Sequence, residues 1–312
     1  MTSYKHYSVL LSECIERLEI KPNGIYLDGT LGMGGHSLEI ARRLTEGGRL
    51  VSIDRDMRAI ERTHDRLADF MDRITLVHGN FRDLSHILNN LGIEKMDGML
   101  FDLGVSSPQL DESERGFSYM ADAPLDMRMD ESESVTAKTV VNTWPEDKLK
   151  RILYDFGEEK FAPAIAAAIV RERQSHEIET TFQLVDIIRG AMPAHALREK
   201  QHPAKRSFQA IRIAVNDELE AVSEMLDTAV DRLKTGGILA VISFHSLEDR
   251  IVKNAIASRE RGCTCPRDFP VCTCGFVQTM TRVTKKPILP SEAELRENPR
   301  SRSAKLRVAR RV

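Results

Sequence analysis

The sequence lacks any apolar run approaching the ~20 residues of a membrane-spanning helix. Its five cysteines in 312 residues are too few for a disulfide-based scaffold. The net charge of −2 does not by itself favour a polyanionic partner. The start, Met1–Lys5, leads into a polar amphipathic segment and has no signal-peptide pattern. With 41% hydrophobic and 29% charged residues, we expect a globular protein of the cytoplasm that contacts no membrane.

The most informative stretch runs from Ile25 to Asp54 and has the pattern of a β-α-β unit. A short apolar run ends at Asp28, a glycine-rich turn covers residues 29–36, and a helical pattern follows. A second predicted strand, residues 49–53, ends at Asp54. Glycines let a backbone pass close to a ligand, and the start of a helix offers N–H groups to an anion. This stretch is therefore the first candidate for a binding site.

The turn fails two common nucleotide-binding patterns. A dinucleotide fingerprint starting at Gly32 and Gly34 would need a third glycine where Ser37 stands, and no lysine is present for a P-loop. The remaining pattern, Asp-Gly-Thr-x-Gly-x-Gly, resembles the first motif of class I S-adenosylmethionine-dependent methyltransferases. Asp54 lies where an acidic residue binds ribose hydroxyls. The alternative is a turn that only packs the helix on the strand, with Asp54 a solvated strand end.

Strand and helix patterns alternate over the first hundred residues, which predicts an α/β fold with a parallel sheet. Predicted strands end at Asp28, Asp54, Asn80-Phe81 and Asp102. Because ligands of such sheets bind beyond the carboxyl ends of the strands, these side chains are expected to converge on one site.

The alternation stops after Asp102, and about 135 residues pass before the next clear strand, Gly237–Phe244. Most of this interval has helical spacing, although residues 109–130 show no regular pattern. We predict three parts: residues 1–107, an inserted helical substrate domain over 108–205, and residues 206–312. Apolar spacing from Phe208 to Leu233 predicts one long helix, and the last strands are expected within 277–285 and 306–309.

The loop after Asp102 bears on the reaction class. Methyltransferases that act on exocyclic amines of bases carry a short Asp/Asn/Ser-Pro-Pro-aromatic motif there, of which Ser107-Pro108 is a partial match. Such an amine is a poor nucleophile, and acceptors that hold its protons favour a reactive geometry. Asp102 and Ser106 are the candidate acceptors, and a plain surface turn is the alternative.

Strings over nearly the whole chain resemble the RsmH (MraW) family, the ribosomal RNA small-subunit methyltransferases H. They are Leu27–Ser37, Asp102–Gln109, His202–Asn216, Ser243–Arg250 and Asn298–Lys305. The resemblance implies a class I (Rossmann-like) methyltransferase sheet with an inserted helical domain. It also implies methyl transfer from S-adenosylmethionine to the exocyclic N4 amine of a cytidine in the decoding region of 16S ribosomal RNA. The implied partner is small-subunit RNA in an assembled or nearly assembled particle.

The same resemblance implies roles for individual residues. Gly34, Gly35 and His36 would hold the methionine end of the cofactor, and Asp54 the ribose. Phe81 would lie against the adenine, and Asp102 and Gln109 would complete the site. From residue type alone, His36 could instead face solvent and Phe81 could belong to the core.

Two further groups are candidates for contact with the substrate. Four residues that follow the predicted strand 237–244 would border the target base: His245, Ser246, Glu248 and Asp249. Alternatively, Ser246 would cap a helix with Asp249 three residues later. Lys205 and Arg206 would touch RNA phosphates, or form a solvated helix start. Residues 285–312 carry nine Lys/Arg and three Glu, a net +6 that suits a phosphate backbone or a solvated face.

Four of the five cysteines cluster as Cys263, Cys265, Cys272 and Cys274. Cytosolic thiols favour metal over disulfide, so a structural zinc ion is one interpretation. Structural zinc sites more often have two-residue gaps between cysteines than the single-residue gaps found here. Cys14 is expected in the core.

Two rival functions remain open at this stage. One is a DNA cytosine or adenine amino methyltransferase, against which the incomplete Pro-Pro motif counts. The other is a nucleotide-binding regulatory protein without catalysis. The sequence leaves monomer and homodimer equally open.

Overall fold

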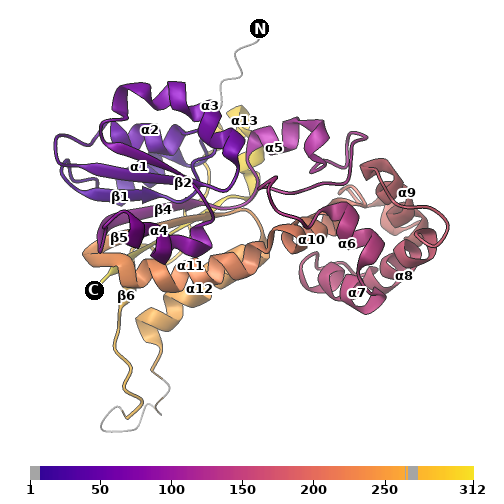
Figure 1. Ribbon diagram of the computed structural model, residues 1–312. Helices are drawn as coiled ribbons and strands as arrows, with labels where there is room; N and C mark the ends of the chain where they lie inside the picture. The colour runs from indigo at the N-terminus through magenta and orange to yellow at the C-terminus, as the bar shows by residue number, and fades with distance from the viewer. Residues whose placement is uncertain (1–7, 264, 266–272) are drawn as a thin grey trace. The chain divides into compact units, whose positions relative to one another are not determined.

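The computed structural model describes residues 8–263, 265 and 273–312. The chain forms two compact units (Figure 1). The first contains the residues up to Gly104 and from Leu219 onwards, and the second is Val105–Glu218. The inserted domain was expected over 108–205, so the second unit begins slightly earlier and ends thirteen residues later.

The first unit is built on a seven-stranded sheet with the strand order β3-β2-β1-β4-β5-β7-β6. β1 to β5 run parallel, and β7 is antiparallel to both β5 and β6. The α/β prediction is thereby confirmed. The strands are β1 (Ile25–Asp28), β2 (Arg49–Asp54), β3 (Ile74–His78), β4 (Met96–Asp102), β5 (Leu233–Ser243), β6 (Met280–Arg282) and β7 (Lys305–Arg311).

Helices cover both faces of this sheet (Figure 1). On one face, α1 (Leu11–Leu18), α2 (Gly35–Ala41) and α3 (Met57–Leu67) enclose one apolar cluster. On the other, α4 (Leu84–Asn90), α11 (Glu218–Arg232) and α12 (Ser246–Arg261) enclose a second. Neighbouring side chains of a strand point to opposite faces, so strands buried on both sides are continuous apolar runs. In β4 all but the final residue is buried, and residues 98–101 form such an apolar run after the buried Asp97.

The register of the sheet brings the ends of the central strands to one edge. Asp28 at the end of β1 lies opposite Leu100 of β4, and Asp54 at the end of β2 lies opposite His78 of β3. β4 itself ends at Asp102. The three acidic residues therefore occupy the carboxyl ends of three adjacent strands, as the strand pattern predicted.

The second unit is helical and has its own apolar core. Its helices are α5 (Ser107–Asp111), α6 (Ala137–Thr143), α7 (Glu146–Asp155), α8 (Ala162–Glu172), α9 (Thr181–Ala191) and α10 (Lys205–Asn216). Thr136 and Thr180 begin α6 and α9 with side-chain hydrogen bonds to the backbone N–H three residues on. Capping of this kind explains the polar residue that precedes the apolar stripe of these two helices.

The long helix predicted from Phe208 to Leu233 is wrong, because the chain breaks into α10 and α11 at Asp217. Asp217 has the left-handed φ of 49°, which ends α10. Asn216 stabilises the break, since its side-chain amide donates to the Met127 carbonyl (2.7 Å) and its oxygen accepts from the Met129 N–H (2.8 Å). Apolar spacing continues across the break, so periodicity alone could not reveal it.

Smaller expectations also need correction. The stretch 109–130, expected to lack regular structure, contains the end of α5 and a 3-10 turn at Ser113–Arg115. The predicted strand over 277–285 is only β6, and the one over 306–309 extends to all of β7. α13 (Glu292–Glu297) and a 3-10 segment, Pro299–Ser303, precede β7.

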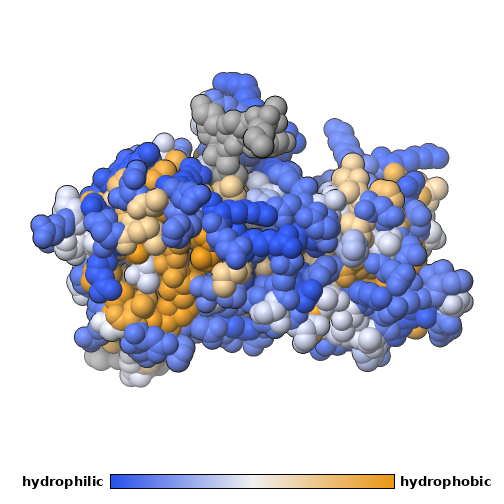
Figure 2. Space-filling model, turned by 45° about the horizontal axis from the view of Figure 1, so that its top comes forward, coloured by the Kyte–Doolittle hydropathy of each residue, from blue (hydrophilic) through white to orange (hydrophobic). Residues whose placement is uncertain are grey.

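The surface drawn in Figure 2 is largely hydrophilic, with an apolar area over the first unit. Among the described residues, no helix combines the length and the apolar character that crossing a bilayer would require.

Candidate functional site

The turn after β1 is organised by the buried carboxylate of Asp28. Asp28 accepts hydrogen bonds from the Ser37 hydroxyl (2.7 Å) and the Thr30 N–H (3.2 Å). Burial raises the pKa of Asp28 to about 7, against the effect of these hydrogen bonds. The Thr30 hydroxyl accepts in turn from the Asp102 N–H at 2.6 Å. The ends of β1 and β4 are thus tied together through one threonine.

Two glycines of the turn have distinct structural reasons. Gly34 has a φ of 73°, a conformation that side chains other than glycine rarely adopt, and it immediately precedes α2. Gly35 leaves no room for a side chain, because a Cβ there would lie 1.9 Å from the Ser8 hydroxyl. The backbone conformation therefore favours glycine at position 34, and a side chain at position 35 would require Ser8 to move, whatever ligand approaches the turn.

Asp54, at the end of β2, presents a fixed carboxylate. One oxygen accepts from the Gly32 N–H (2.8 Å) and the other from the Asp56 N–H (2.9 Å). Burial raises the pKa of Asp54 to about 6, and the two backbone hydrogen bonds oppose that rise. Each carboxylate oxygen has a second acceptor position, so Asp54 can still accept from ligand hydroxyls.

Asp102 and His36 face each other at the end of β4. The Nδ1 atom of His36 lies 3.9 Å from Asp102 Oδ2, and its Nε2 lies 3.1 Å from the Val9 carbonyl oxygen. His36 is only 4% exposed, so it is not the solvent-facing histidine of the alternative interpretation. Since a carbonyl only accepts, Nε2 carries a proton, and Nδ1 is directed at the carboxyl group.

Among the three strand-end acids, the carboxyl group of Asp102 has the fewest hydrogen bonds from the described residues to offset its burial. Its side chain is 23% exposed, yet the Oδ1 atom is buried without a hydrogen-bond partner among the described residues. Burial raises the pKa of Asp102 well above its usual range, and the charges of Asp28 and Glu248 raise it further. A buried acceptor of this kind costs free energy unless a ligand donates to it.

Phe81 lies beyond β3, in the 3-10 turn Phe81–Asp83 that begins at Asn80. Its ring contacts Phe101 edge to face, with ring centroids 6.0 Å apart. Phe101 immediately precedes Asp102, so this contact places Phe81 beside the end of β4. Phe81 is only partly buried and packs against the core, which leaves part of the side chain available for a ligand.

The start of α12 follows β5 at the same edge and corrects one detail. The N-cap is His245 with Glu248 three residues later, not Ser246 with Asp249. Glu248 is buried, accepts from the Phe244 N–H (2.8 Å) and lies 3.1 Å from His245 Nε2. Asp249 instead pairs with Arg307 of β7 (2.6 Å). His245 is therefore held by a buried carboxylate at the sheet edge.

The remaining predicted residues belong to the second unit. The Ser106 N–H donates to the Gln109 side-chain oxygen at 3.0 Å, so these two residues form the start of α5. Lys205 and Arg206 are the first residues of α10, where Lys205 is exposed. Next to them, His202 stacks on Tyr119 with ring centroids 4.5 Å apart.

The sequence places Thr30 in the glycine turn and Glu248 among the residues that follow the predicted strand 237–244, but it does not predict the structural role of either. The Thr30 hydroxyl accepts from the Asp102 N–H, a contact between distant parts of the chain. The capping role of Glu248 was missed because Ser246–Asp249 matches the capping pattern as well as His245–Glu248 does. The contacts of Glu248 with the Phe244 N–H and of Asp249 with β7 separate the two registers.

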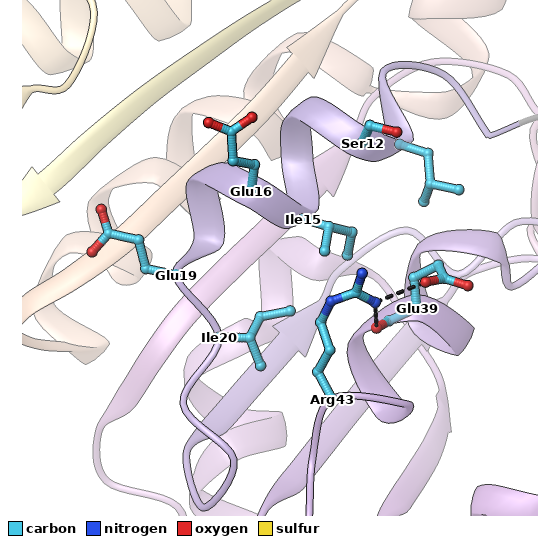
Figure 3. A pocket seen from close by; sticks show the side chains of 8 residues that line it. Ser12, Ile15, Glu16, Glu19, Ile20, Glu39 and Arg43 are labelled. Carbon is cyan, nitrogen blue, oxygen red and sulfur yellow. Dashed lines mark hydrogen bonds and ion pairs between the residues drawn. The ribbon is translucent and has the colours of Figure 1, made fainter.

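A separate hollow of about 450 Å³ lies over α1 and α2 (Figure 3). Its lining contains none of the predicted site residues. It is lined by Leu11, Ser12, Ile15, Glu16, Glu19, Ile20, Glu39 and Arg43. Arg43 points toward Glu39 and pairs with it at 2.7 Å, so this cation is satisfied within the chain.

Comparison with known proteins gives a consistent family. Residues 3–312 match the model of the MraW methylase family. A protein of Brevibacillus brevis called ribosomal RNA small subunit methyltransferase H is 54% identical over 310 residues, which is 99% of each chain. Ribosomal RNA small subunit methyltransferase H 2 of Agathobacter rectalis is 55% identical over 98% of each chain. The ribosomal RNA small subunit methyltransferase H of a Paenibacillus species is 53% identical, and the match covers 99% of this chain and 100% of that protein.

These matches confirm the resemblance stated from the sequence strings and the expected fold class. The seven-stranded sheet is the class I (Rossmann-like) methyltransferase sheet, and its strand-end acids occupy the edge where that fold binds ligands. With a family match over residues 3–312 and relatives more than half identical over nearly their full length, the chain belongs to the MraW methylase family.

Proposed function

We propose that the protein transfers a methyl group from S-adenosylmethionine to the exocyclic N4 amine of a cytidine in the decoding region of 16S ribosomal RNA. Family membership and the names of the relatives support small-subunit ribosomal RNA as the substrate. The observation on which the proposal rests is the group of acids at the ends of β1, β2 and β4, of which Asp28 is buried and Asp54 and Asp102 are partly buried, all three with raised pKa values.

The acids fit the cofactor in charge. Buried carboxyls with raised pKa values are stabilised when a cation binds beside them. When bound, S-adenosylmethionine supplies a methyl group on a positively charged sulfur, and it carries an ammonium group as well. In this assignment Asp54 accepts from the ribose hydroxyls, and Phe81 contacts the adenine. Gly34, Gly35, His36 and Gln109 complete the cofactor site.

Asp102 is assigned to both the cofactor site and catalysis. Its buried Oδ1 has no hydrogen-bond partner in the described part of the chain and is an acceptor for an N–H group. The target amine carries such groups, and accepting from one orients the nitrogen lone pair toward the methyl donor. Ser106, four residues further along, is assigned as the second acceptor. Holding the amine in line is the main catalytic contribution, since no covalent enzyme intermediate is required.

Contacts with RNA are assigned to four residues. His245 and Ser246 at the start of α12 border the target base, and Lys205 and Arg206 at the start of α10 contact phosphates. We propose an assembled or nearly assembled small subunit in the cytoplasm as the natural substrate. Sedimentation of the purified protein distinguishes the monomer from the homodimer.

Mass spectrometry of nucleosides from small-subunit ribosomal RNA tests the proposal. Cells lacking the gene should lose N4-methylcytidine at one position, and the wild-type gene should restore it. Asp102→Asn should restore it poorly, because losing an electrostatic contact in the transition state costs about 10²–10³ in rate. A methylcytidine that persists in the deletion strain would remove the functional assignment. In vitro, labelled cofactor with naked RNA, small subunits and DNA separates the substrate alternatives.

A further inference from the structure

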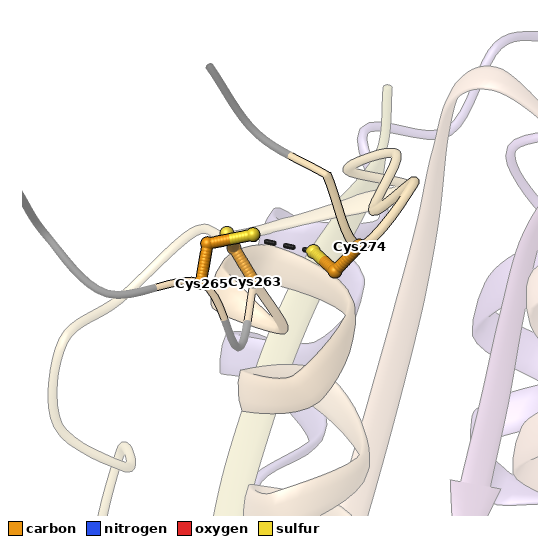
Figure 4. Close-up of side chains that lie close together, drawn as sticks. All are labelled: Cys263, Cys265 and Cys274. Carbon is orange, nitrogen blue, oxygen red and sulfur yellow. Dashed lines mark hydrogen bonds between the residues drawn. The ribbon is translucent and has the colours of Figure 1, made fainter. Parts of the chain in front are cut away.

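Three cysteine side chains meet where α12 ends, away from the strand-end site (Figure 4). The sulfur atoms of Cys263, Cys265 and Cys274 lie within 4.8 Å of one another. The sulfurs of Cys263 and Cys274 are 3.6 Å apart. Residues eleven positions apart in the chain therefore present thiols to one common point.

The chain on both sides of these thiols is held by ordinary contacts. The Thr279 N–H donates to the Arg259 carbonyl (3.1 Å), and Arg282 of β6 donates to Glu260 of α12 (2.6 Å). Gly262 lies against the Phe276 ring so closely that a Cβ there would come within 2.8 Å of it. The segment after Cys274 is thus packed against the last turns of α12, which keeps Cys263 and Cys274 close.

The sulfur spacing suits one tetrahedral metal ion. With a metal–sulfur distance of about 2.3 Å, two tetrahedral thiolate ligands lie about 3.8 Å apart. A disulfide would need about 2.05 Å, far shorter than the observed separation of Cys263 and Cys274. The backbone N–H of Thr273 donates to the Cys265 sulfur (3.3 Å), an orienting contact of the kind that surrounds metal ligands.

We propose that Cys263, Cys265 and Cys274 bind a structural Zn²⁺ ion that fastens the end of α12 to the segment leading into β6. Thiolates select soft metals, and a set of sulfurs that can share one tetrahedral ion is the ligand arrangement of a structural zinc site. Each thiol releases its proton on binding. The fourth cysteine of the sequence pattern, Cys272, lies outside the described residues, and the site does not touch the strand-end acids.

Metal analysis of the purified full-length chain tests the proposal. The chain, prepared under reducing conditions without chelator, should contain stoichiometric zinc. Cys263→Ser, Cys265→Ser and Cys274→Ser should each lose it, while Cys14→Ala should retain it. Cys14 is the matched control because it is a buried thiol of α1 outside the cluster. Equal zinc content in all four variants would overturn the proposal.

A second measurement uses the unaltered chain, so it does not depend on the folding of variants. Removing zinc with a chelator should lower the thermal midpoint, and adding Zn²⁺ back should restore it. Co²⁺ in its place should give the visible absorption of a tetrahedral thiolate site. The proposal fails if the chain takes up neither metal, if visible spectra show an iron–sulfur cluster, or if thiol counting and mass spectrometry show a disulfide.

Discussion

Replacing Asp54 with asparagine should weaken cofactor binding strongly while leaving the fold intact. Each carboxylate oxygen already accepts one backbone N–H, from Gly32 and from Asp56, and keeps one acceptor position for a ribose hydroxyl. Asparagine removes the charge and replaces one acceptor oxygen with a donor. A hydrogen bond to a charged group contributes about 1.5–3 kcal/mol, so affinity should fall about 10- to 150-fold.

The pH dependence gives this prediction a definite sign. Ribose hydroxyls donate to the ionised carboxylate, and the pKa of Asp54 is about 6. Wild-type affinity should therefore be full above that pKa and decline as the pH falls through it. Asp54→Asn should show a smaller decline, because asparagine does not titrate and only the other strand-end acids, Asp28 and Asp102, still do. Isothermal titration calorimetry with S-adenosylmethionine and S-adenosylhomocysteine at about pH 5 and pH 7.5 measures both effects.

Two controls separate a lost contact from a disturbed turn. Asp56→Asn makes the same chemical change two residues away, and asparagine caps a helix as well as aspartate, so affinity should hardly change. A cofactor analogue without the ribose hydroxyls should bind the wild-type protein weakly, and it should bind Asp54→Asn with the same low affinity. The ribose role of Asp54 is wrong if the cofactor affinity of Asp54→Asn is within about threefold of that of wild type. It is also wrong if the free-energy losses from the substitution and from removing the ribose hydroxyls add fully.

Three further substitutions test the network around the site. The native pKa of Asp28, about 7, exceeds its unfolded value, so the wild-type protein loses stability as the pH rises from about 4 to 7. Asp28→Asn does not titrate, so its free energy of unfolding should rise relative to that of wild type over the same range. The difference should reach at most about 4 kcal/mol in urea unfolding. Asp249→Ala breaks the pair with Arg307 and should lower the free energy of unfolding by about 2 kcal/mol above about pH 4. The pair lowers the pKa of Asp249, so the difference from wild type should shrink in acid, where Asp249 becomes protonated. Thr30→Val leaves the Asp102 N–H without its acceptor and should cost about 1–3 kcal/mol by thermal unfolding; a change below 0.5 kcal/mol would contradict the tie between β1 and β4.

The strand ends were predictable because parallel strands buried on both faces are continuous apolar runs that stop where a polar residue follows. Asp28, Asp54 and Asp102 all terminate such runs, and sheet geometry places them at one edge without further information. The clustering of these acids therefore follows from the strand patterns and from the rule that ligands bind at the carboxyl ends of parallel strands.

Other features depend on contacts that a linear pattern does not contain. The break at Asp217 rests on Asn216 bonding to a loop almost ninety residues earlier, while the apolar spacing continues undisturbed. The cap register of α12 rests on Asp249 meeting a strand at the end of the chain. In both cases a tertiary hydrogen bond chooses between local structures that the sequence permits almost equally.

The threonine that joins β1 to β4 has a mechanical consequence. The backbone N–H of Gly29 donates to the Leu100 carbonyl (2.8 Å), and the Thr30 hydroxyl accepts from the Asp102 N–H. Two hydrogen bonds therefore connect the glycine turn to the end of β4, just before the loop assigned to the target base. Because both hydrogen bonds join the same two segments, the glycine turn and the end of β4 cannot change position independently without breaking one of them.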